Sequence, residues 1–322
     1  MVNKNQVVLV TGAAGFIGFH LSKKLLEMGE RVVGVDNLNS YYDVNLKKAR
    51  LEILKSNNNF GFYKEDIQNL DALKDIFRQR QVKIICNLAA QAGVRHSLKH
   101  PFSYQKSNLE GFLNLLELAR KYKVNNFIYA SSSSIYGNNK NIPFSVDDRV
   151  DTPISLYAAT KKANELMAHA YSHLYQIPCT GLRYFTVYGP WGRPDMALFL
   201  FTDAILKGMP INVYNYGRMK RDFTYIDDII EGTIAALNRP VPYEVFNLGN
   251  SDSVHLLAFI RILEEELGQE AEKNMMPMQP GDVAETAADI QKSRKLLGFN
   301  PKTSLREGIK KFVAWYRQYY LS

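Results

Sequence analysis

A tyrosine and a lysine four residues apart give the clearest indication of proton-transfer chemistry in this sequence. Tyr157 and Lys161 fall within an expected helix over 156–175, in which side chains at positions i and i+4 share one face. A general base that acts on an alcohol needs a pKa near 7, whereas the pKa of free tyrosine is about 10. A neighbouring ammonium favours the charged phenolate and lowers that pKa. We therefore expect Tyr157, assisted by Lys161, to remove a proton from an alcohol.

Four consecutive serines, at 131–134, follow an expected strand over 126–130. Their hydroxyls can donate hydrogen bonds to a sugar oxygen or to a carboxylate. A serine run can also be a flexible linker, but a strand precedes this one and Ile135-Tyr136-Gly137 follows it directly. We expect a binding loop at the carboxyl end of that strand.

Three glycines, Gly12, Gly15 and Gly18, lie between an expected strand over 6–10 and a helix over 18–28. Glycines allow a tight turn and a close backbone approach to a pyrophosphate, and the helix N-terminus adds amide donors. The third glycine would let the helix pack closely on the strand. The spacing is G-x-x-G-x-x-G rather than the G-x-G-x-x-G of ordinary dinucleotide sites.

Two carboxylates follow the next two strands. Asp36 ends the strand over 31–36, where it can accept both hydroxyls of an adenosine ribose and would repel a 2′-phosphate, so NAD is favoured over NADP. Asp66 follows the strand over 60–63 and can reach the adenine amine. Asp66 could equally cap the helix that begins at Leu70.

These side chains need a parallel sheet to bring them together. Apolar strands alternate with helical segments, which indicates a sheet covered on both faces. We expect an α/β fold, a Rossmann-type doubly wound parallel sheet with a smaller, interleaved C-terminal substrate domain. The expected strands are 6–10, 31–36, 60–63, 83–88, 126–130 and 179–183, and the helices are 18–28, 46–54, 70–80, 101–122 and 156–175.

The domain division follows from this pattern. Residues 1–185 would bind the dinucleotide, and 223–249 would return to that domain. Residues 186–322, whose many prolines suggest irregular structure, would mainly bind the substrate.

Composition limits the partners and the cellular location that we expect for this protein. The chain has 322 residues, 46% of them hydrophobic, and a formal charge of +8, but its basic residues are dispersed, so we expect no nucleic-acid partner. No apolar run reaches membrane-spanning length, and the signal-peptide pattern is lacking. Two cysteines cannot form a disulfide framework, which favours the cytoplasm. His169 and His173 lack the glutamate of an H-E-x-x-H pattern, so no metal site is expected.

The combined motifs resemble the extended short-chain dehydrogenase/reductase family of nucleotide-sugar epimerases. The resemblance runs over nearly the whole chain, and the UDP-glucuronate 4-epimerase branch is the most similar. Thr186 stands where related enzymes for neutral sugars often have Asn, which favours an acidic substrate. The segments that carry the resemblance are 10–18, 36–38, 88–95, 131–137, 157–161 and 221–223, with 39–43, 89–95 and 182–196 typical of the branch.

The resemblance implies NAD as cofactor and a UDP-sugar as substrate, with UDP-glucuronate and UDP-galacturonate interconverted through a 4-keto sugar. It implies catalytic roles for Ser132, Tyr157 and Lys161. It implies cofactor contacts from Gly12, Gly15, Phe16, Ile17, Gly18, Asp36, Asn37, Asn39, Asp66, Ile67, Leu88, Ala89, Ala90, Asn108, Tyr157, Lys161 and Tyr184. Substrate contacts would come from Gln91, Arg95, Ser132, Ser133, Ser134, Thr186, Arg193, Arg221 and Asp282. It also implies a homodimer, in which the helices over 102–122 and 156–175 form a four-helix bundle.

Four other functions remain open at this point. A UDP-glucose or UDP-N-acetylhexosamine 4-epimerase and a UDP-glucuronate decarboxylase would use the same residues. A 4,6-dehydratase commonly has an acidic pair where this chain has Ser133 and Ser134. A NAD-binding sensor on the same fold would have no need to keep both Tyr157 and Lys161.

Overall fold

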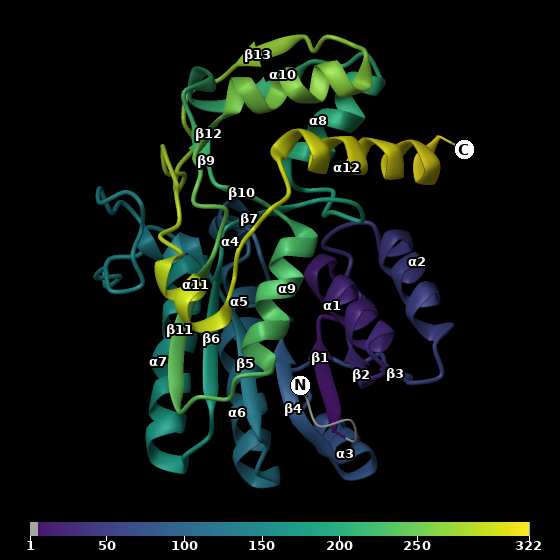
Figure 1. Ribbon diagram of the computed structural model, residues 1–322, viewed down its shortest axis with the longest axis vertical. Coiled ribbons are helices and arrows are strands. Elements are labelled where there is room, and N and C mark those ends of the chain that lie inside the picture. The colour runs from purple at the N-terminus through teal and green to yellow at the C-terminus, as the bar shows by residue number, and fades with distance from the viewer. Residues whose placement is uncertain (1–5, 322) are drawn as a thin grey trace.

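The core element of the molecule is a seven-stranded parallel sheet, with strand order β3-β2-β1-β4-β5-β6-β11 (Figure 1). The computed structural model describes residues 6–321, so residues 1–5 and 322, at the ends of the expected domains, lie outside the described residues. The order reverses beside β1, as in doubly wound dinucleotide-binding folds, and the expected fold class is confirmed. The strands are β1 Val7–Thr11, β2 Arg31–Val35, β3 Phe60–Tyr63, β4 Val82–Asn87, β5 Asn126–Ser132, β6 Cys179–Tyr184 and β11 Tyr243–Leu248.

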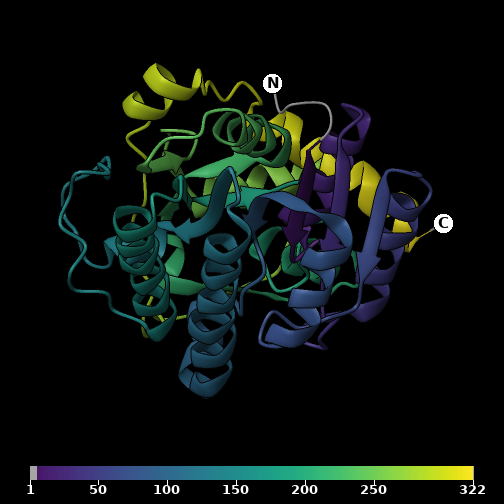
Figure 2. The ribbon, with the colours of Figure 1, turned by 90° about the horizontal axis from the view of Figure 1, so that it is seen from below.

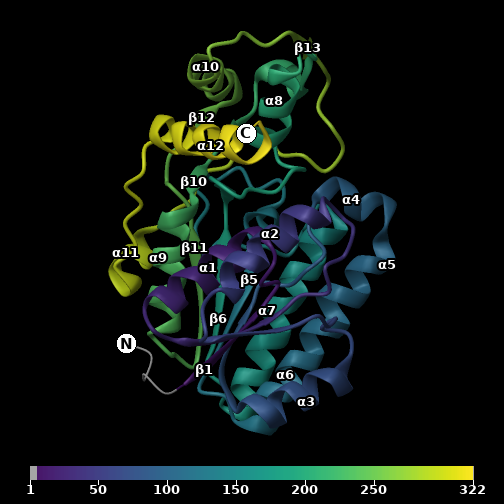
Figure 3. The same ribbon diagram turned by 90° about the vertical axis from the view of Figure 1, so that its right-hand side faces the viewer.

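Both faces of the sheet are buried, which explains the continuous apolar strands. Along β1, Val8 and Val10 face one hydrophobic cluster, and Val7 and Leu9 face the other, because side chains alternate along a strand. Figure 3 shows α9 on one side of the sheet and α3 and α6 on the other. The first face is covered by α1 Phe16–Glu27, α2 Val44–Lys55 and α9 Ile226–Leu237, and the second by α3 Leu70–Arg80, α6 Gly111–Tyr122 and α7 Leu156–Tyr175.

The expected single helix over 101–122 is wrong in detail. It consists of α5 Pro101–Tyr104, a π-helical turn η1 Gln105–Glu110 and α6, and it is preceded by a helix that was not expected, α4 Val94–Lys99. The π turn contains Asn108, whose buried side chain hydrogen-bonds to the backbone of Gln91. The first helix also starts earlier than expected, at Phe16 rather than at Gly18.

The region above the sheet is more regular than the prolines suggested, because helices and short two-stranded sheets form much of it (Figure 1). Phe199, Phe312 and Trp315 pack together there, and this long-range burial outweighs the local effect of the prolines. Its helices are α8 Ala197–Leu206, α10 Leu256–Leu267 and α12 Leu305–Tyr320, whereas α11 Gln291–Leu297 lies lower, beside β11 and α9. Three two-stranded sheets complete it, from β7 Thr186–Tyr188 with β10 Phe223–Tyr225, β9 Lys220–Arg221 with β12 Val254–His255, and β8 Ile211–Val213 with β13 Lys273–Met275.

Seen from below, α6 and α7 lie side by side on one face of the molecule (Figure 2). Within residues 6–321, none of the helices has the length and hydropathy needed to cross a bilayer.

Candidate active site

A cleft of about 390 Å³ opens at the carboxyl ends of the strands, where ligands bind in folds of this type. Most of the residues expected to bind cofactor or substrate line it. They are Gly12, Gly15, Phe16, Ile17, Gly18, Asp36, Asn37, Asn39, Asp66, Ile67, Leu88, Ala89, Ala90, Gln91, Ser132, Ser133, Ser134, Tyr157, Lys161, Tyr184, Thr186 and Arg193.

The glycine turn has the form of a cradle for a pyrophosphate. Gly12 has a φ of +70°, and a Cβ there would lie 2.9 Å from the amide nitrogen of Ala89. A Cβ on Gly18 would lie 2.0 Å from the carbonyl oxygen of Gly12, so only glycine lets α1 start this close to the turn. No side chain caps the N-terminus of α1, and Gly15, Phe16 and Ile17 line the cleft. The residues present therefore fit a dinucleotide.

Asp36 and Asp66 shape the adenosine end of the cleft. The Asp36 carboxylate accepts hydrogen bonds from the amides of Ala14, at 3.1 Å, and Leu38, at 2.9 Å. Asp66 accepts a hydrogen bond from the Asn37 side chain at 2.7 Å. The alternative that Asp66 caps α3 is wrong, because the side chain of Asn69 caps that helix.

Tyr157 and Lys161 face the cleft from the first turns of α7. The Lys161 ammonium donates to the Ala130 carbonyl at 2.7 Å and lies 6.0 Å from the centre of the Tyr157 ring. Burial lowers the pKa of Lys161 to about 8. Burial also raises the pKa of Tyr157, while a hydrogen bond with Ser132 and the charge of Arg193 act against that shift. Lys161 does not produce the expected lowering of the Tyr157 pKa in this structure, because desolvation of the phenolate outweighs the effects that lower this pKa. A further lowering by the positive nicotinamide of bound NAD stays a prediction.

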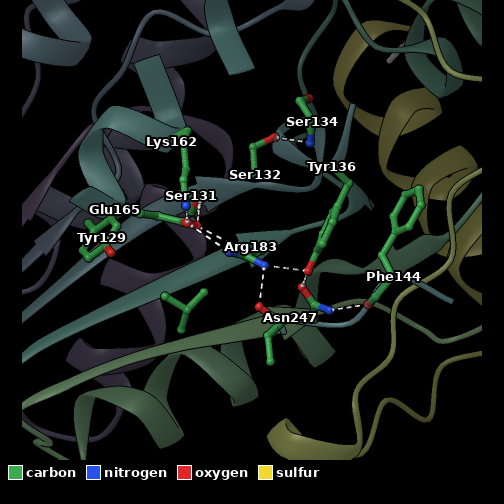
Figure 4. Close-up of polar contacts among 12 residues, drawn as sticks. Tyr129, Ser131, Ser132, Ser134, Tyr136, Phe144, Lys162, Glu165, Arg183 and Asn247 are labelled. Atoms are coloured by element: carbon green, nitrogen blue, oxygen red, sulfur yellow. Dashed lines mark hydrogen bonds and ion pairs between the residues drawn. The ribbon is translucent and has the colours of Figure 1, made fainter. Parts of the chain in front are cut away.

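The serine loop is held from behind by a buried polar network (Figure 4). Ser131 donates to Glu165 at 2.7 Å, and Glu165 forms a two-pronged ion pair with Arg183 at 2.9 Å for both contacts. Arg183 also donates to the Tyr136 hydroxyl at 2.9 Å. The network joins β5, α7 and β6 just below Ser132, so that Ser132, Ser133 and Ser134 face the cleft from a fixed base.

Gln91 has an orphaned polar atom at this site. Its side-chain nitrogen is buried without a hydrogen-bond partner in the described part of the chain, and the residue lines the cleft. Because a buried amide without a partner costs free energy, this nitrogen is suited to meet a polar ligand.

Four expected site residues do not line the cleft. Asn108 lies behind it and fixes Gln91 and Thr160 by hydrogen bonds. Arg95 and Asp282 form an ion pair at 2.7 Å. Burial lowers the pKa of Arg221, and the nearby charges of Asp282 and Arg95 shift this pKa in opposite directions.

Arg193 has a partner that the motifs did not suggest. Its guanidinium pairs with Asp195, which also accepts a hydrogen bond from the hydroxyl of Tyr41. Tyr41 and Asp195 both occur in segments typical of the epimerase branch, so those segments were the only signal that could have found them. Sequence reasoning also gave no role to several other residues that line the cleft, including Tyr42, Lys47, Glu65, Ser107 and Met196.

Comparison with known proteins gives a consistent result. The sequence profile of the NAD dependent epimerase/dehydratase family matches residues 8–249, which confirms the resemblance expected from the motifs. The chain is 47% identical to a protein of Rhizobium meliloti named probable UDP-glucuronate 4-epimerase, over 97% of each chain.

Two solved structures are similar over nearly their full length. The crystal structure of UDP-glucuronic acid 4-epimerase from Bacillus cereus, in complex with UDP-glucuronic acid and NAD, superposes with a TM-score of 0.93 at 38% identity, covering 98% of this chain and 100% of that one. The UDP-glucose 4-epimerase of Thermotoga maritima, with UDP-glucose, gives a TM-score of 0.89 at 33% identity, covering 97% and 99%.

Proposed function

Because this chain belongs to the NAD dependent epimerase/dehydratase family, we propose that it is a NAD-dependent 4-epimerase that interconverts UDP-glucuronate and UDP-galacturonate. The proposal rests on one observation: a single cleft is lined both by the glycine turn with Asp36 and by Tyr157, Lys161 and the serine loop. A dinucleotide and a sugar alcohol could therefore meet in it.

The glycine turn would hold the pyrophosphate of NAD on the amides of α1, and Asp36 would hold the adenosine ribose. NAD, when bound, supplies the reversible oxidation at C4 of the sugar. A positive nicotinamide would also favour the charged form of Tyr157, whose pKa burial raises.

Tyr157 would take the proton of the 4-hydroxyl and later return it. Ser132, which already interacts with the phenol, would hold the 4-oxygen in place. Lys161 would keep a positive charge near the base, since its pKa of about 8 leaves it mostly protonated at neutral pH.

Ser133, Ser134 and Thr186 would hold the sugar carboxylate, and Arg193 could pair with it ionically. A 4-keto uronic acid is a β-keto acid, and its decarboxylation draws charge out of the carboxylate into the ring. Hydrogen bonds on the carboxylate stabilise localised charge, at about 1.5–3 kcal/mol each, and so oppose that loss.

The test is to incubate the purified protein separately with UDP-glucuronate, UDP-glucose and UDP-N-acetylglucosamine and to identify the products by NMR. We expect UDP-galacturonate from the first and much slower conversion of the other two. Faster turnover of either neutral sugar would favour the UDP-glucose or UDP-N-acetylhexosamine epimerase, and UDP-pentose would favour the decarboxylase.

Tyr157→Phe separates an enzyme from a sensor. We expect this variant to bind UDP-glucuronate but to lose activity by about a thousandfold, since a general base contributes roughly 10²–10⁴-fold. Undiminished turnover in Tyr157→Phe would contradict the proposed base. A sensor would show no transient absorbance near 340 nm when wild-type protein meets UDP-glucuronate.

We further propose that residues 1–185, with 223–249, hold NAD and that 186–322 mainly hold the UDP-sugar. Arg95, Arg221 and Asp282, which lie close together, would form the nucleotide end of the substrate site. A cytoplasmic location is consistent with two free, buried cysteines. A homodimer through α6 and α7 is supported by the exposed apolar side chains of Leu113, Leu166 and Leu174.

A further inference from the structure

The loop after β7 carries an ion pair whose arginine, Arg193, lines the cleft. Arg193 donates to Asp195 through Nε at 2.9 Å and through Nη2 at 2.5 Å. Both side chains are about three-quarters buried, with exposed fractions of 23% and 29%. This two-pronged geometry is the one a guanidinium uses to bind a ligand carboxylate.

Tyr41 holds the carboxylate of this pair from the opposite wall. Its hydroxyl donates to Asp195 Oδ2 at 2.9 Å, and its ring lies 5.9 Å from the Arg193 guanidinium carbon. Gly93, with a φ of +100°, makes room for it, because a Cβ there would lie 2.7 Å from the Tyr41 hydroxyl. Tyr41 belongs to the segment between β2 and α2, so the contact joins the two walls of the cleft.

The loop is fixed on its other side as well. Arg50 donates to the carbonyls of Trp191, at 2.6 Å, and Gly192, at 3.3 Å. The ring of His20 lies 2.9 Å from the carbonyl of Pro190. Arg193 and Asp195 therefore lie on a loop whose preceding backbone is anchored by side chains of α1 and α2.

Charge explains what the pair does when no ligand is bound. Burial disfavours the cationic form of Arg193, but the adjacent Asp195 more than offsets this and raises the arginine pKa. The carboxylate in turn makes the pair neutral overall. A sugar carboxylate that approached the Nε and Nη2 edge of Arg193 would find that edge already paired with an anion of the same chemical type.

We propose that Asp195, positioned by Tyr41, is the internal counter-ion of Arg193, and that the carboxylate of a hexuronate substrate binds Arg193 only in competition with it. This rests on the proposed function. Asp195 is then a positioning residue that sets specificity. It weakens the binding of the sugar carboxylate to Arg193, so that the oxidised sugar can leave Arg193 and rotate within the site. A neutral sugar has no carboxylate to compete with Asp195, so its affinity does not depend on the charge of Asp195.

The test measures binding rather than turnover. NAD-loaded protein with Tyr157→Phe is titrated with UDP-glucuronate and with UDP-glucose by calorimetry, with and without Asp195→Asn, which keeps the size of the side chain and removes its charge. We expect the Kd for UDP-glucuronate to fall about tenfold, since the guanidinium would no longer be neutralised by an internal anion and could form charge-assisted hydrogen bonds with the sugar carboxylate. The Kd for UDP-glucose should change by less than about twofold.

Two conservative variants refine the test. Asp195→Glu restores the charge and should return the ratio of the two Kd values toward that of the parent. Tyr41→Phe keeps the ion pair but removes the hydrogen bond that positions the Asp195 carboxylate. It should therefore lower the Kd for UDP-glucuronate by a smaller factor. Asp151→Asn is the matched control, because Arg149 and Asp151 form an exposed pair with the same spacing and should leave both Kd values unchanged.

A purely structural role for Asp195 would weaken both ligands alike, and that result would overturn the proposal. So would an unchanged ratio, or a selective loss of UDP-glucuronate binding. The proposed function is decided separately, by the products that wild-type protein forms from UDP-glucuronate, and its failure would leave the measured ratio for Asp195 still interpretable.

Discussion

At the residue scale, burial sets the protonation of the groups that would do the chemistry. Tyr157 resists ionisation because its phenolate would be desolvated, and burial lowers the pKa of Lys161 to about 8, which still leaves it mostly charged at neutral pH. A cationic ligand beside Tyr157 would oppose the rise in its pKa, so the base would become active only when the cofactor is in place.

The role of the serine and threonine hydroxyls in preventing decarboxylation can be tested from the products that variants form. We expect Ser133→Ala combined with Thr186→Val to raise the fraction of UDP-pentose formed from UDP-glucuronate, because fewer donors hold charge on the carboxylate. NMR of the product mixture measures this fraction. A double variant that is slow but makes no pentose would contradict the role of these hydroxyls, and Ser56→Ala, on the exposed end of α2, is the control.

His20 should make stability depend on pH. Burial lowers its pKa from 6.5 to about 4. Between these two pH values the unfolded chain binds a proton on His20, whereas the folded protein does not. The folded state should therefore lose about 2 kcal/mol as the pH falls from 7 to 4.5, relative to a chain without this group. Urea unfolding at both pH values measures the loss.

His20→Gln supplies the comparison for this prediction. The glutamine amide can still donate to the Pro190 carbonyl, but it does not titrate, so the variant should lose about 2 kcal/mol less between the two pH values than the wild type. Equal losses in both proteins would show that His20 is not responsible.

At the element scale, one buried arginine ties the two walls of the cleft together. Arg50, on α2, is fully buried and donates to the carbonyl of Ala14 in the glycine turn as well as to Trp191 and Gly192. It also donates to the hydroxyl of Tyr42. The cofactor turn and the loop that carries Arg193 therefore share one support.

Arg50→Met should damage stability and cofactor retention together. Removing the guanidinium leaves buried carbonyls without donors, which we expect to cost about 2–4 kcal/mol of unfolding free energy. NAD content after dialysis and urea unfolding would measure the two effects. Arg78→Met on the exposed face of α3 should change neither, and retention of full stability by Arg50→Met would refute the shared support.

At the scale of the whole molecule, α6 and α7 expose apolar side chains that the monomer does not cover. Leu166 and Leu174 are 60% and 65% exposed, and such patches mark contact surfaces. We expect Leu166→Arg with Leu174→Arg to convert a homodimer to a monomer, as measured by light scattering. Met209→Arg, at an exposed site in the upper region, should leave the mass unchanged, and a wild-type monomer would contradict the proposed assembly.

Local patterns in the sequence were enough for the sheet, the glycine turn and the pairing of Tyr157 with Lys161. Strand and helix periods, the positions of glycines and an i, i+4 spacing depend on neighbours within a few residues, so the chain itself carried that information. The order of residues likewise indicated the family, and it predicts Asp36 as a ribose ligand, which stays a prediction.

Only the tertiary structure decided which charges meet and how burial acts on them. The contact between Tyr41 and Asp195 joins residues 154 positions apart, and Arg50 reaches carbonyls more than 140 positions away. The direction of the Tyr157 pKa shift depended on desolvation by surrounding elements rather than on the lysine one turn along the helix. Desolvation and long-range pairing are sums over the folded surroundings, and no spacing along the chain encodes them.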